Sequence, residues 1–286
     1  MRILVATDLS PRSDRALARA YGLAQELKAE LEILYVADAD QPAELKTHAI
    51  EWARAALEKE TAVLEASTGV KAHAEVLAGH PKTDIAIQAS ARKADLIVLG
   101  THNRAAMPTK RSFAATTAGQ IVKASRLPVL LVREDATRPY REVAIGVDFS
   151  VYSRAALREG FRLAPAARFH LIHAFEVPFK GFMSSESSAQ EIALDQRLEF
   201  DAFLKEEMDL LARRGIDKGI PADRLEKIVR EGDARMVVPA ECERIGADVV
   251  VIGTHGRTGV SAAIWGSVAT DLLNNPPTDV LVVKAF

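Results

Sequence analysis

The stretch from Val249 to Ala269 carries the residues whose types and spacing best fit a chemical task. It opens with four consecutive β-branched residues, which are typical of a strand buried on both faces in a parallel sheet. Four glycines follow, at Gly253, Gly256, Gly259 and Gly266, and Ser267 then begins a helical pattern. Glycines let a backbone approach an anion closely, and the unpaired N–H groups at a helix start point at it. The stretch therefore predicts a phosphate-binding loop, and the ligand we expect is a nucleotide.

Composition limits the classes of protein to which the chain can belong. Its 286 residues are 48% hydrophobic and 27% charged, with a net charge of −2, and this length suits two α/β domains of about 140 residues each. The charge balance gives no general attraction to nucleic acid or acidic membranes, and no apolar run approaches the ~20 residues that span a bilayer. The N-terminus lacks signal-peptide features, and the single cysteine, Cys242, excludes an internal disulfide. We expect a cytoplasmic protein with no nucleic-acid or membrane partner.

The chain repeats one unit twice. Residues 2–10 (RILVATDLS) return as residues 142–150 (EVAIGVDFS), and residues 94–102 (ADLIVLGTH) return as residues 247–255 (ADVVVIGTH). Repetition of landmarks in the same order indicates a duplicated unit. A polar, proline-containing stretch lies between the copies and is typical of a linker. We predict a first domain over 1–134, a linker over 135–140 and a second domain over 141–286.

Within each copy, strand patterns alternate with helix patterns. We expect strands at 3–6, 31–36, 70–77, 96–99 and 129–132, and again at 143–147, 169–174, 225–229, 249–252 and 280–283. Helices are expected between them, at 13–28, 44–67, 82–92, 115–124 and 189–214 among others. Alternation of this kind predicts the α/β class: two tandem doubly wound domains, each with a five-stranded parallel sheet flanked by helices.

Ligands of such sheets bind beyond the carboxyl ends of the strands, where the winding reverses. Three pairs of residues from the two copies fall at these strand ends: Asp8 and Asp148, Val36 and Ala174, and Gly100 and Gly253. The expected topology therefore gathers the marked residues of each copy into one crevice.

On these residues the chain resembles the universal stress protein family in its tandem two-domain form, over nearly all of both halves. The nucleotide-binding signature of that family is Gly, two residues, Gly, nine residues, then Gly followed by Ser or Thr. The second half matches it fully with Gly253, Gly256, Gly266 and Ser267. The resemblance implies a Rossmann-like fold of the adenine nucleotide alpha-hydrolase type. It also implies ATP, ADP or another adenine nucleotide as ligand, with Mg²⁺ as an optional companion.

The resemblance also implies roles for individual residues. In ATP-binding relatives the glycine loop and the Ser or Thr hold the phosphates, and the ends of the first two strands surround the base. This places Gly253, Gly256, Gly266, Ser267 and Val268 at the phosphates and ribose, and Asp148 and Ala174 at the base. Arg257 would add a charge-assisted contact to a phosphate. The alternative role for Asp148 is to cap the following helix through Ser150.

The first half departs from the signature. Gly100 is kept, but Asn103 stands at the second glycine, and Ala115 and Thr116 stand at the Gly-Ser pair. Asparagine tolerates left-handed dihedral angles, whereas the methyl group of Ala115 obstructs a close backbone approach. We predict a degenerate first site, either empty or altered in specificity. Its weaker candidate residues are Asp8, Val36, Gly100 and Thr116.

Catalytic machinery is not evident in the sequence. The chain has no P-loop lysine, no GxSxG elbow and no base beside a nucleophile. His102 and His255 have no second ligand at metal spacing, so we expect hydrogen bonding within their loops and no metal site. Slow ATP hydrolysis or autophosphorylation, known for some members of the resembled family, is the most that we expect of it as an enzyme.

The leading hypothesis is a stress-response sensor or regulator that binds ATP mainly in its second domain. One alternative is a stress protein that acts through protein contacts without nucleotide, and another is a slow ATP hydrolase on the same fold. The short apolar runs at 129–132 and 280–283 are expected at sheet edges, where unpaired backbone groups invite pairing. They predict internal pairing of the two domains as a pseudo-dimer, and a homodimer is also open.

Overall fold

The computed structural model describes residues 1–101, 112–135, 138–177, 186–213, 220–255 and 265–285. Their contacts divide the chain into two compact units. The first unit consists of Met1–Pro139 with Leu273–Lys284, and the second consists of Tyr140–Leu272. Across the described residues, every helix is too short or too polar to traverse a bilayer.

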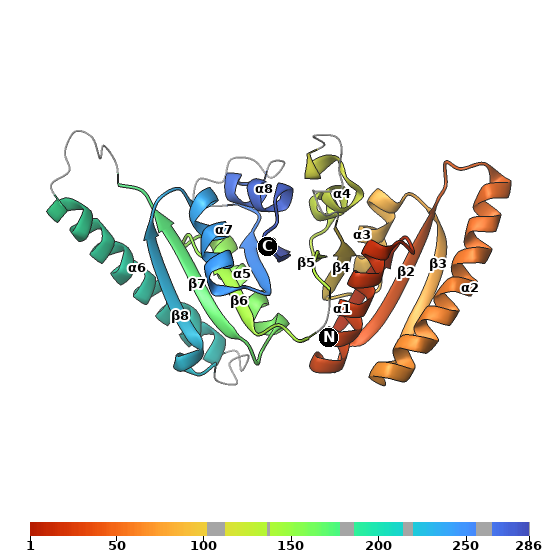
Figure 1. The fold of residues 1–286 in the computed structure, drawn as a ribbon, viewed down its shortest axis with the longest axis horizontal. Coiled ribbons are helices and arrows are strands. Elements are labelled where there is room, and N and C mark those ends of the chain that lie inside the picture. Colours follow the sequence, from red (N-terminus) through yellow and green to blue (C-terminus); the bar gives the residue numbers. More distant parts are fainter. Residues whose placement is uncertain (102–111, 136–137, 178–185, 214–219, 256–264, 286) are drawn as a thin grey trace. The chain divides into compact units, whose positions relative to one another are not determined.

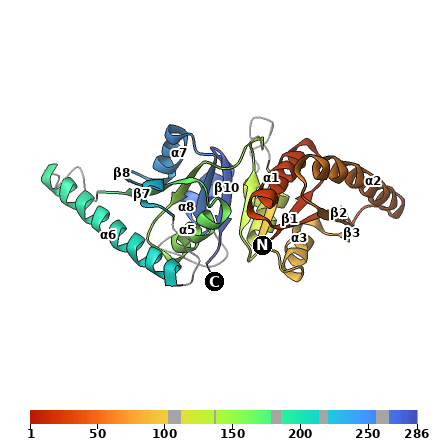
Figure 2. The same cartoon turned by 90° about the horizontal axis from the view of Figure 1, so that it is seen from below.

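The first unit is a parallel sheet covered by helices (Figure 1). Its strands follow the order β3-β2-β1-β4-β5, and their bounds are β1 (Arg2–Thr7), β2 (Glu30–Asp38), β3 (Ala72–Gly79), β4 (Leu96–Gly100) and β5 (Val129–Val132). The helices are α1 (Pro11–Leu27), α2 (Ala43–Thr68), α3 (Pro81–Ala91) and α4 (Thr117–Ala124), with the 3₁₀ turn η2 (Phe113–Ala115) before α4. Figure 2 shows α1 and α2 on one face of these strands and α3 on the other. From β1 the chain adds strands first on one side (β2, β3) and then on the other (β4, β5), so the winding reverses between β1 and β4.

The second unit repeats this arrangement. Its parallel strands follow the order β9-β6-β7-β8, with bounds β6 (Glu142–Gly146), β7 (Arg168–Phe175), β8 (Leu225–Glu231) and β9 (Val249–Gly253). Its helices are α5 (Val151–Leu163), α6 (Glu186–Arg213), α7 (Ala234–Ile245) and α8 (Ser267–Asn274), with the 3₁₀ turn η3 (Ala222–Arg224) before β8. The predicted α/β fold is confirmed, and each strand lies within two residues of its expected bounds.

Both cores consist mainly of aliphatic strand residues packed against one face of each helix. Val249, Val250 and Val251 of β9 are fully buried, as a strand covered on both faces requires. On α1, Leu17 and Tyr21 lie one turn apart and are also fully buried. The helix repeat places residues four apart on the same face, so the apolar stripe of α1 lies against the sheet.

The last strand, β10 (Asp279–Val283), belongs by its contacts to the first unit and pairs antiparallel with β5. Its first residue, Asp279, is fully buried. The carboxylate of Asp279 accepts hydrogen bonds from the backbone N–H groups of Arg133 (2.8 Å) and Glu134 (3.0 Å). It also lies 3.5 Å from the guanidinium of Arg19 on α1. The repeat pattern in the sequence places this strand in the second copy, whereas its contacts join it to the first unit.

We expect Asp279→Ala to lower the free energy of unfolding by about 3–5 kcal/mol, because it removes the buried carboxylate beside Arg19 and the acceptor of two backbone N–H groups. Urea unfolding followed by circular dichroism measures the change. Asp135→Ala is the matched control, since Asp135 is exposed on the segment that follows β5. A loss of stability no larger in Asp279→Ala than in Asp135→Ala would contradict this role for the carboxylate.

Candidate functional site

An aspartate follows the first strand of each unit and organises the turn into the next helix. In the second unit the Asp148 carboxylate accepts hydrogen bonds from the backbone N–H (3.1 Å) and hydroxyl (2.6 Å) of Ser150. The Ser150 side chain in turn accepts a bond from the N–H of Ser153 and caps α5. Phe149, between them, has a φ of +63°, so the turn is tight. The capping role considered for Asp148 is therefore present in the structure.

Asp8 makes the same turn in the first unit and has an additional cationic partner. Its carboxylate accepts hydrogen bonds from Ser10 and Ser13, and Arg12 on the first turn of α1 lies 3.0 Å away. Partial burial favours a higher pKa for Asp8, but the hydrogen bonds from Ser10, Ser13 and Arg12 outweigh it and lower the pKa to about 2. Tyr152 replaces Arg12 at the matching position of α5. Asp8 is thus engaged by a cation from its own helix, at a place where the second unit carries a phenol ring.

Gly100 and Gly253, at the ends of β4 and β9, lie against the first turn of a helix. A Cβ added to Gly253 would fall 2.6 Å from Cβ and 2.9 Å from the carbonyl carbon of Tyr152. A Cβ added to Gly100 would fall 2.5 Å from the carbonyl oxygen of Arg12. Both glycines are therefore required by helix packing, whatever part they take in binding. The contact brings the aspartate turn and the glycine loop to the same strand ends.

The glycine loop of the second unit is closed at its base by a backbone hydrogen bond. The N–H of Gly266 donates to the carbonyl of Thr254, over 2.9 Å. The carbonyl of Gly266 accepts the first bond of α8, from the N–H of Thr270, so Gly266 holds the N-cap position. Glycine has no side chain with which to cap the helix, so the first-turn N–H groups of α8 depend on another acceptor. An anion is the ligand that such a helix start favours.

The first unit starts α4 differently. Thr116 holds the N-cap position, level with Gly266 of α8, because its carbonyl accepts the first helical bond from Gln120. Its hydroxyl accepts a bond from the N–H of Gly119 and donates to the carbonyl of Phe113. The 3₁₀ turn η2 packs so closely on α4 that a Cβ on Gly119 would fall 2.1 Å from the carbonyl oxygen of Phe113. The N-terminus of α4 is thus capped by its own chain.

The remaining predicted site residues divide between the described and undescribed parts of the chain. Ala174 lies half-buried near the end of β7, and Val36 lies buried near the end of β2. Ser267 is exposed at the first position of α8, and Val268 follows it half-buried. Gly256, Arg257, His102 and Asn103 lie outside the described residues.

His255 and Trp265 flank the glycine loop. The Nδ1 atom of His255 lies 3.0 Å from the hydroxyl of Thr254, and its ring packs 5.0 Å, centre to centre, from that of Tyr152. The hydrogen bond expected for His255 within its loop is therefore present. Trp265 is half-buried.

Sequence reasoning missed an exposed cluster at the ends of β2 and β3. Ligand atoms of Asp38, Asp40 and His80 lie within 4.8 Å of one another. Asp38 and His80 come from strand ends that neighbour each other only in the folded sheet, and no spacing in the sequence marks them. Exposed acidic groups commonly lie this close without a metal ion, so the cluster alone does not define a metal site.

Comparison with known proteins gives the chain a family. A family model described as the universal stress protein family matches residues 1–133 and 139–284. The chain belongs to the universal stress protein family. A universal stress protein from Methanocaldococcus jannaschii is 34% identical over 142 residues, which are 46% of this chain and 82% of that protein. Some other family members are matched over much less of their length, down to 24% for one from Salmonella typhi.

Solved universal stress proteins share the fold. One from Archaeoglobus fulgidus superposes with a TM-score of 0.71 at 20% identity, covering 100% of this chain and 98% of that one. Another, solved in complex with cAMP, is 23% identical with a TM-score of 0.40, and covers 52% of this chain and 100% of its own. The tandem arrangement of universal stress protein domains is thus found in the family model and in the fold.

We expect Gly253→Ala to destabilise the protein by about 1–3 kcal/mol, because the added methyl group forces the Tyr152 backbone to move. Gly22→Ala is the matched control. Gly22 lies inside α1 with no atom within 4 Å of an added Cβ, so the change should stabilise the helix by about 0.5–1 kcal/mol. Thermal unfolding of the two variants checks the opposite signs, and equal effects would refute the packing argument.

The lowered pKa of Asp8 predicts a stability difference that depends on pH. A carboxylate with a depressed folded-state pKa stabilises the fold above its unfolded pKa of about 3.9, and this contribution disappears as the pH falls through about 2. Asp8 is exposed to solvent, so we expect Asp8→Asn to cost less than about 1 kcal/mol at pH 7. Urea midpoints of Asp8→Asn and the parent protein should converge between pH 4 and pH 2, on the order of these pKa values. A constant gap across that range would exclude the ionised carboxylate as the cause.

Proposed function

We propose that this universal stress protein binds an adenine nucleotide, with ATP as the first choice, at the carboxyl ends of β6, β7 and β9. Binding in the second unit would let the protein act as a sensor or regulator in a stress response. The proposal combines the complete glycine signature of the second unit with the way in which α8 begins.

The N-cap glycine of α8 is the observation that carries the proposal. Gly266 cannot cap its own helix, and its N–H is held by the carbonyl of Thr254, so the loop returns to a fixed point beside β9. A phosphate at that point would accept hydrogen bonds from the first-turn N–H groups of α8 and lie at the positive end of the helix dipole. The hydroxyl of Ser267 is exposed there and can donate a further bond.

The base and ribose would lie toward Asp148 and Ala174. Asp148 follows β6, which pairs with β9, and Ala174 lies near the end of β7, which pairs with β6. Doubly wound sheets bind their ligands beyond such strand ends. Ser150 occupies one oxygen of the Asp148 carboxylate, and a carboxylate has acceptor capacity for further donors. One carboxylate can therefore both cap α5 and accept a ribose hydroxyl.

We propose that the first unit binds nucleotide weakly or not at all. Thr116 caps α4 with its hydroxyl, which satisfies an amide that a phosphate would otherwise use. Arg12 holds the carboxylate of Asp8, the counterpart of Asp148. The two differences act at opposite ends of the crevice, so restoring one of them would not restore the site.

The direct test is calorimetric titration of the purified protein with ATP, ADP, AMP and cAMP, each with and without Mg²⁺. We expect one nucleotide per chain. Gly266→Val should weaken binding more than tenfold, because a branched side chain would occupy the approach of the phosphate. Circular dichroism establishes that the variant is folded.

Ala115→Val is the control in the first unit, at the position aligned with Gly266 by sequence and one residue before Thr116, the N-cap that is level with Gly266 in the structure. Ala115 is exposed before α4, so its substitution should leave affinity and stoichiometry unchanged. A stoichiometry of two that falls to one in Ala115→Val would refute the assignment of binding to the second unit. Absence of binding for every nucleotide at millimolar concentration would refute the proposed function and leave a protein that acts through protein contacts.

A further inference from the structure

One face of α2 carries apolar side chains that the fold of the first unit leaves exposed. Leu45, Trp52 and Val63 are 60%, 52% and 63% exposed. They belong to a set of residues spaced alternately by four and three, which places them on one side of the helix. We call this set the α2 seam, and its members are Leu45, Ala49, Trp52, Ala56, Lys59 and Val63. A different face of α2 packs in the core through Ala53 and Leu57, which are buried.

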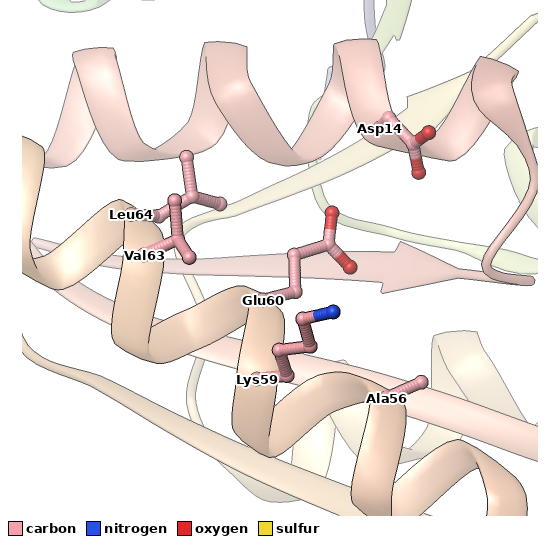
Figure 3. Close-up of a pocket in the computed structure, with 6 residues that line it drawn as sticks. All are labelled: Asp14, Ala56, Lys59, Glu60, Val63 and Leu64. Carbon is pink, nitrogen blue, oxygen red and sulfur yellow. The ribbon is translucent and has the colours of Figure 1, made fainter.

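A hollow of 440 Å³ lies beside the seam, between α2 and α1. Figure 3 shows its lining residues: Asp14, Ala56, Lys59, Glu60, Val63 and Leu64. Ala56, Val63 and Leu64 give it an apolar wall. The carboxylates of Asp14 and Glu60 point toward each other across it. Burial and the nearby charge of Asp14 raise the pKa of Glu60, so the hollow favours a group that brings an N–H donor on an apolar body.

The second unit fills the corresponding space between its helices with a side chain. Arg154 of α5 is the counterpart of Asp14 when the two aspartate turns are aligned. Its guanidinium extends to Glu206 (2.9 Å) and Glu207 (3.2 Å) of α6 and lies over the ring of Phe203. A long side chain thus occupies the space between the two helices of the second unit. In the first unit the short Asp14 leaves that space open.

We propose that the α2 seam is a homodimer interface, in which two α2 helices pack antiparallel about a two-fold axis near Ala56 and the Trp52 of each copy enters the hollow of the other. An antiparallel pair centred on Ala56 sets Trp52 opposite Glu60 of the second copy. It also sets Ala49 opposite Val63. The small side chain of Ala56 lets the two helices approach at the axis.

The chemistry of the two parts is complementary. The indole ring is a large apolar body whose only polar atom is an N–H donor. The hollow offers an apolar wall and two carboxylate acceptors, with Lys59 beside Glu60. The projecting residue and its receptor lie on the same helix face, at similar distances on either side of Ala56. This is the self-complementary arrangement that a two-fold interface requires, and it identifies a second copy of this chain as the partner.

Association through the α2 seam does not involve the other contacts of the first unit. α2 packs against β2 and β3, and β3 is at the opposite end of the parallel strands from β5. Association through α2 therefore does not compete with the pairing of β5 and β10. It is also independent of the proposed nucleotide site, because no residue of the seam belongs to that site.

The size of the contact indicates a reversible dimer. Trp52 is 52% exposed, so the two tryptophan side chains bury about 150–260 Å² between them on association. The other seam residues must supply the remainder of the roughly 1,000 Å² that a specific interface needs. Interfaces of this small size are typical of weak, transient association, so we expect a dissociation constant on the order of micromolar.

Sedimentation velocity of the full chain over roughly 1–200 µM, a range chosen to bracket that constant, tests the proposal. We expect a concentration-dependent doubling of mass in the parent protein. Trp52→Ala should weaken association more than tenfold. Ala56→Glu should abolish it, since each copy would place a carboxylate at the two-fold axis. The control Ile87→Ala removes an equally exposed apolar side chain from α3, outside the seam, and should associate like the parent.

The outcomes decide the proposal. A parent protein that stays at single-chain mass throughout, or a dimer that forms equally well in Trp52→Ala, would overturn it. Association unchanged in Ala56→Glu would exclude the two-fold axis near that residue. Trp52 and Ala56 are not core residues, so circular dichroism should show both variants folded. Failure of nucleotide binding would leave the result of this test unaffected.

Discussion

The close approach of a helix's first turn to the end of a neighbouring strand determines how the aspartate turn and the strand-end glycine lie in each unit. In each unit the strand ends at a glycine, Gly100 or Gly253, because a Cβ there would collide with the first turn of α1 or α5. The contact holds the aspartate turn after β1 or β6 beside the loop that leaves β4 or β9. Without it, the residues that the topology brings to the same edge would not face a common space.

The two units use this shared geometry differently because a few side chains differ around it. Arg12 of the first unit neutralises Asp8, and Tyr152 stands at the same place in the second. Thr116 caps α4, and Gly266 leaves the amides of α8 for another acceptor. These differences concern polar groups at helix starts, where a single hydroxyl or its absence changes which hydrogen bonds are available. The fold itself tolerates both versions.

The sequence was sufficient to predict the order and type of the elements. Unbroken β-branched runs such as Val249–Ile252 and the apolar spacing of α1 depend on local periodicity, which survives folding unchanged. The pattern also placed Gly100, Gly253, Asp8 and Asp148 at or just after strand ends, where the structure has them. The packing role of Gly253 was not predictable, because it depends on the distance to Tyr152, about a hundred residues earlier in the chain. The contact of Arg12 with Asp8 follows from helix geometry only once the start of α1 is known.

The placement of the last strand shows a second limit of sequence reasoning. The repeat pattern assigns β10 to the second copy, and its edge character predicted pairing with the first. The sequence did not indicate that Asp279 would be fully buried beside Arg19 while accepting two backbone hydrogen bonds. Neither residue has a counterpart of the same type in the other repeat, so comparison of the repeats could not reveal the pair.

The long helices α2 and α6 differ in how their side chains are paired within each unit. Each helix has a buried face, with Ala53 and Leu57 on α2 and Phe203 and Glu207 on α6. In α6 the larger ring and the buried glutamate bind Arg154, so charge and volume are matched within the unit. In α2 the smaller residues and Asp14 leave a hollow and an exposed tryptophan. A buried cluster satisfied within its own chain gains nothing from a partner, whereas an apolar seam beside two carboxylates does. The repeat whose α4 is capped by Thr116 thus carries the exposed apolar face, and the repeat whose α8 begins at Gly266 pairs the charges of its long helix within the unit.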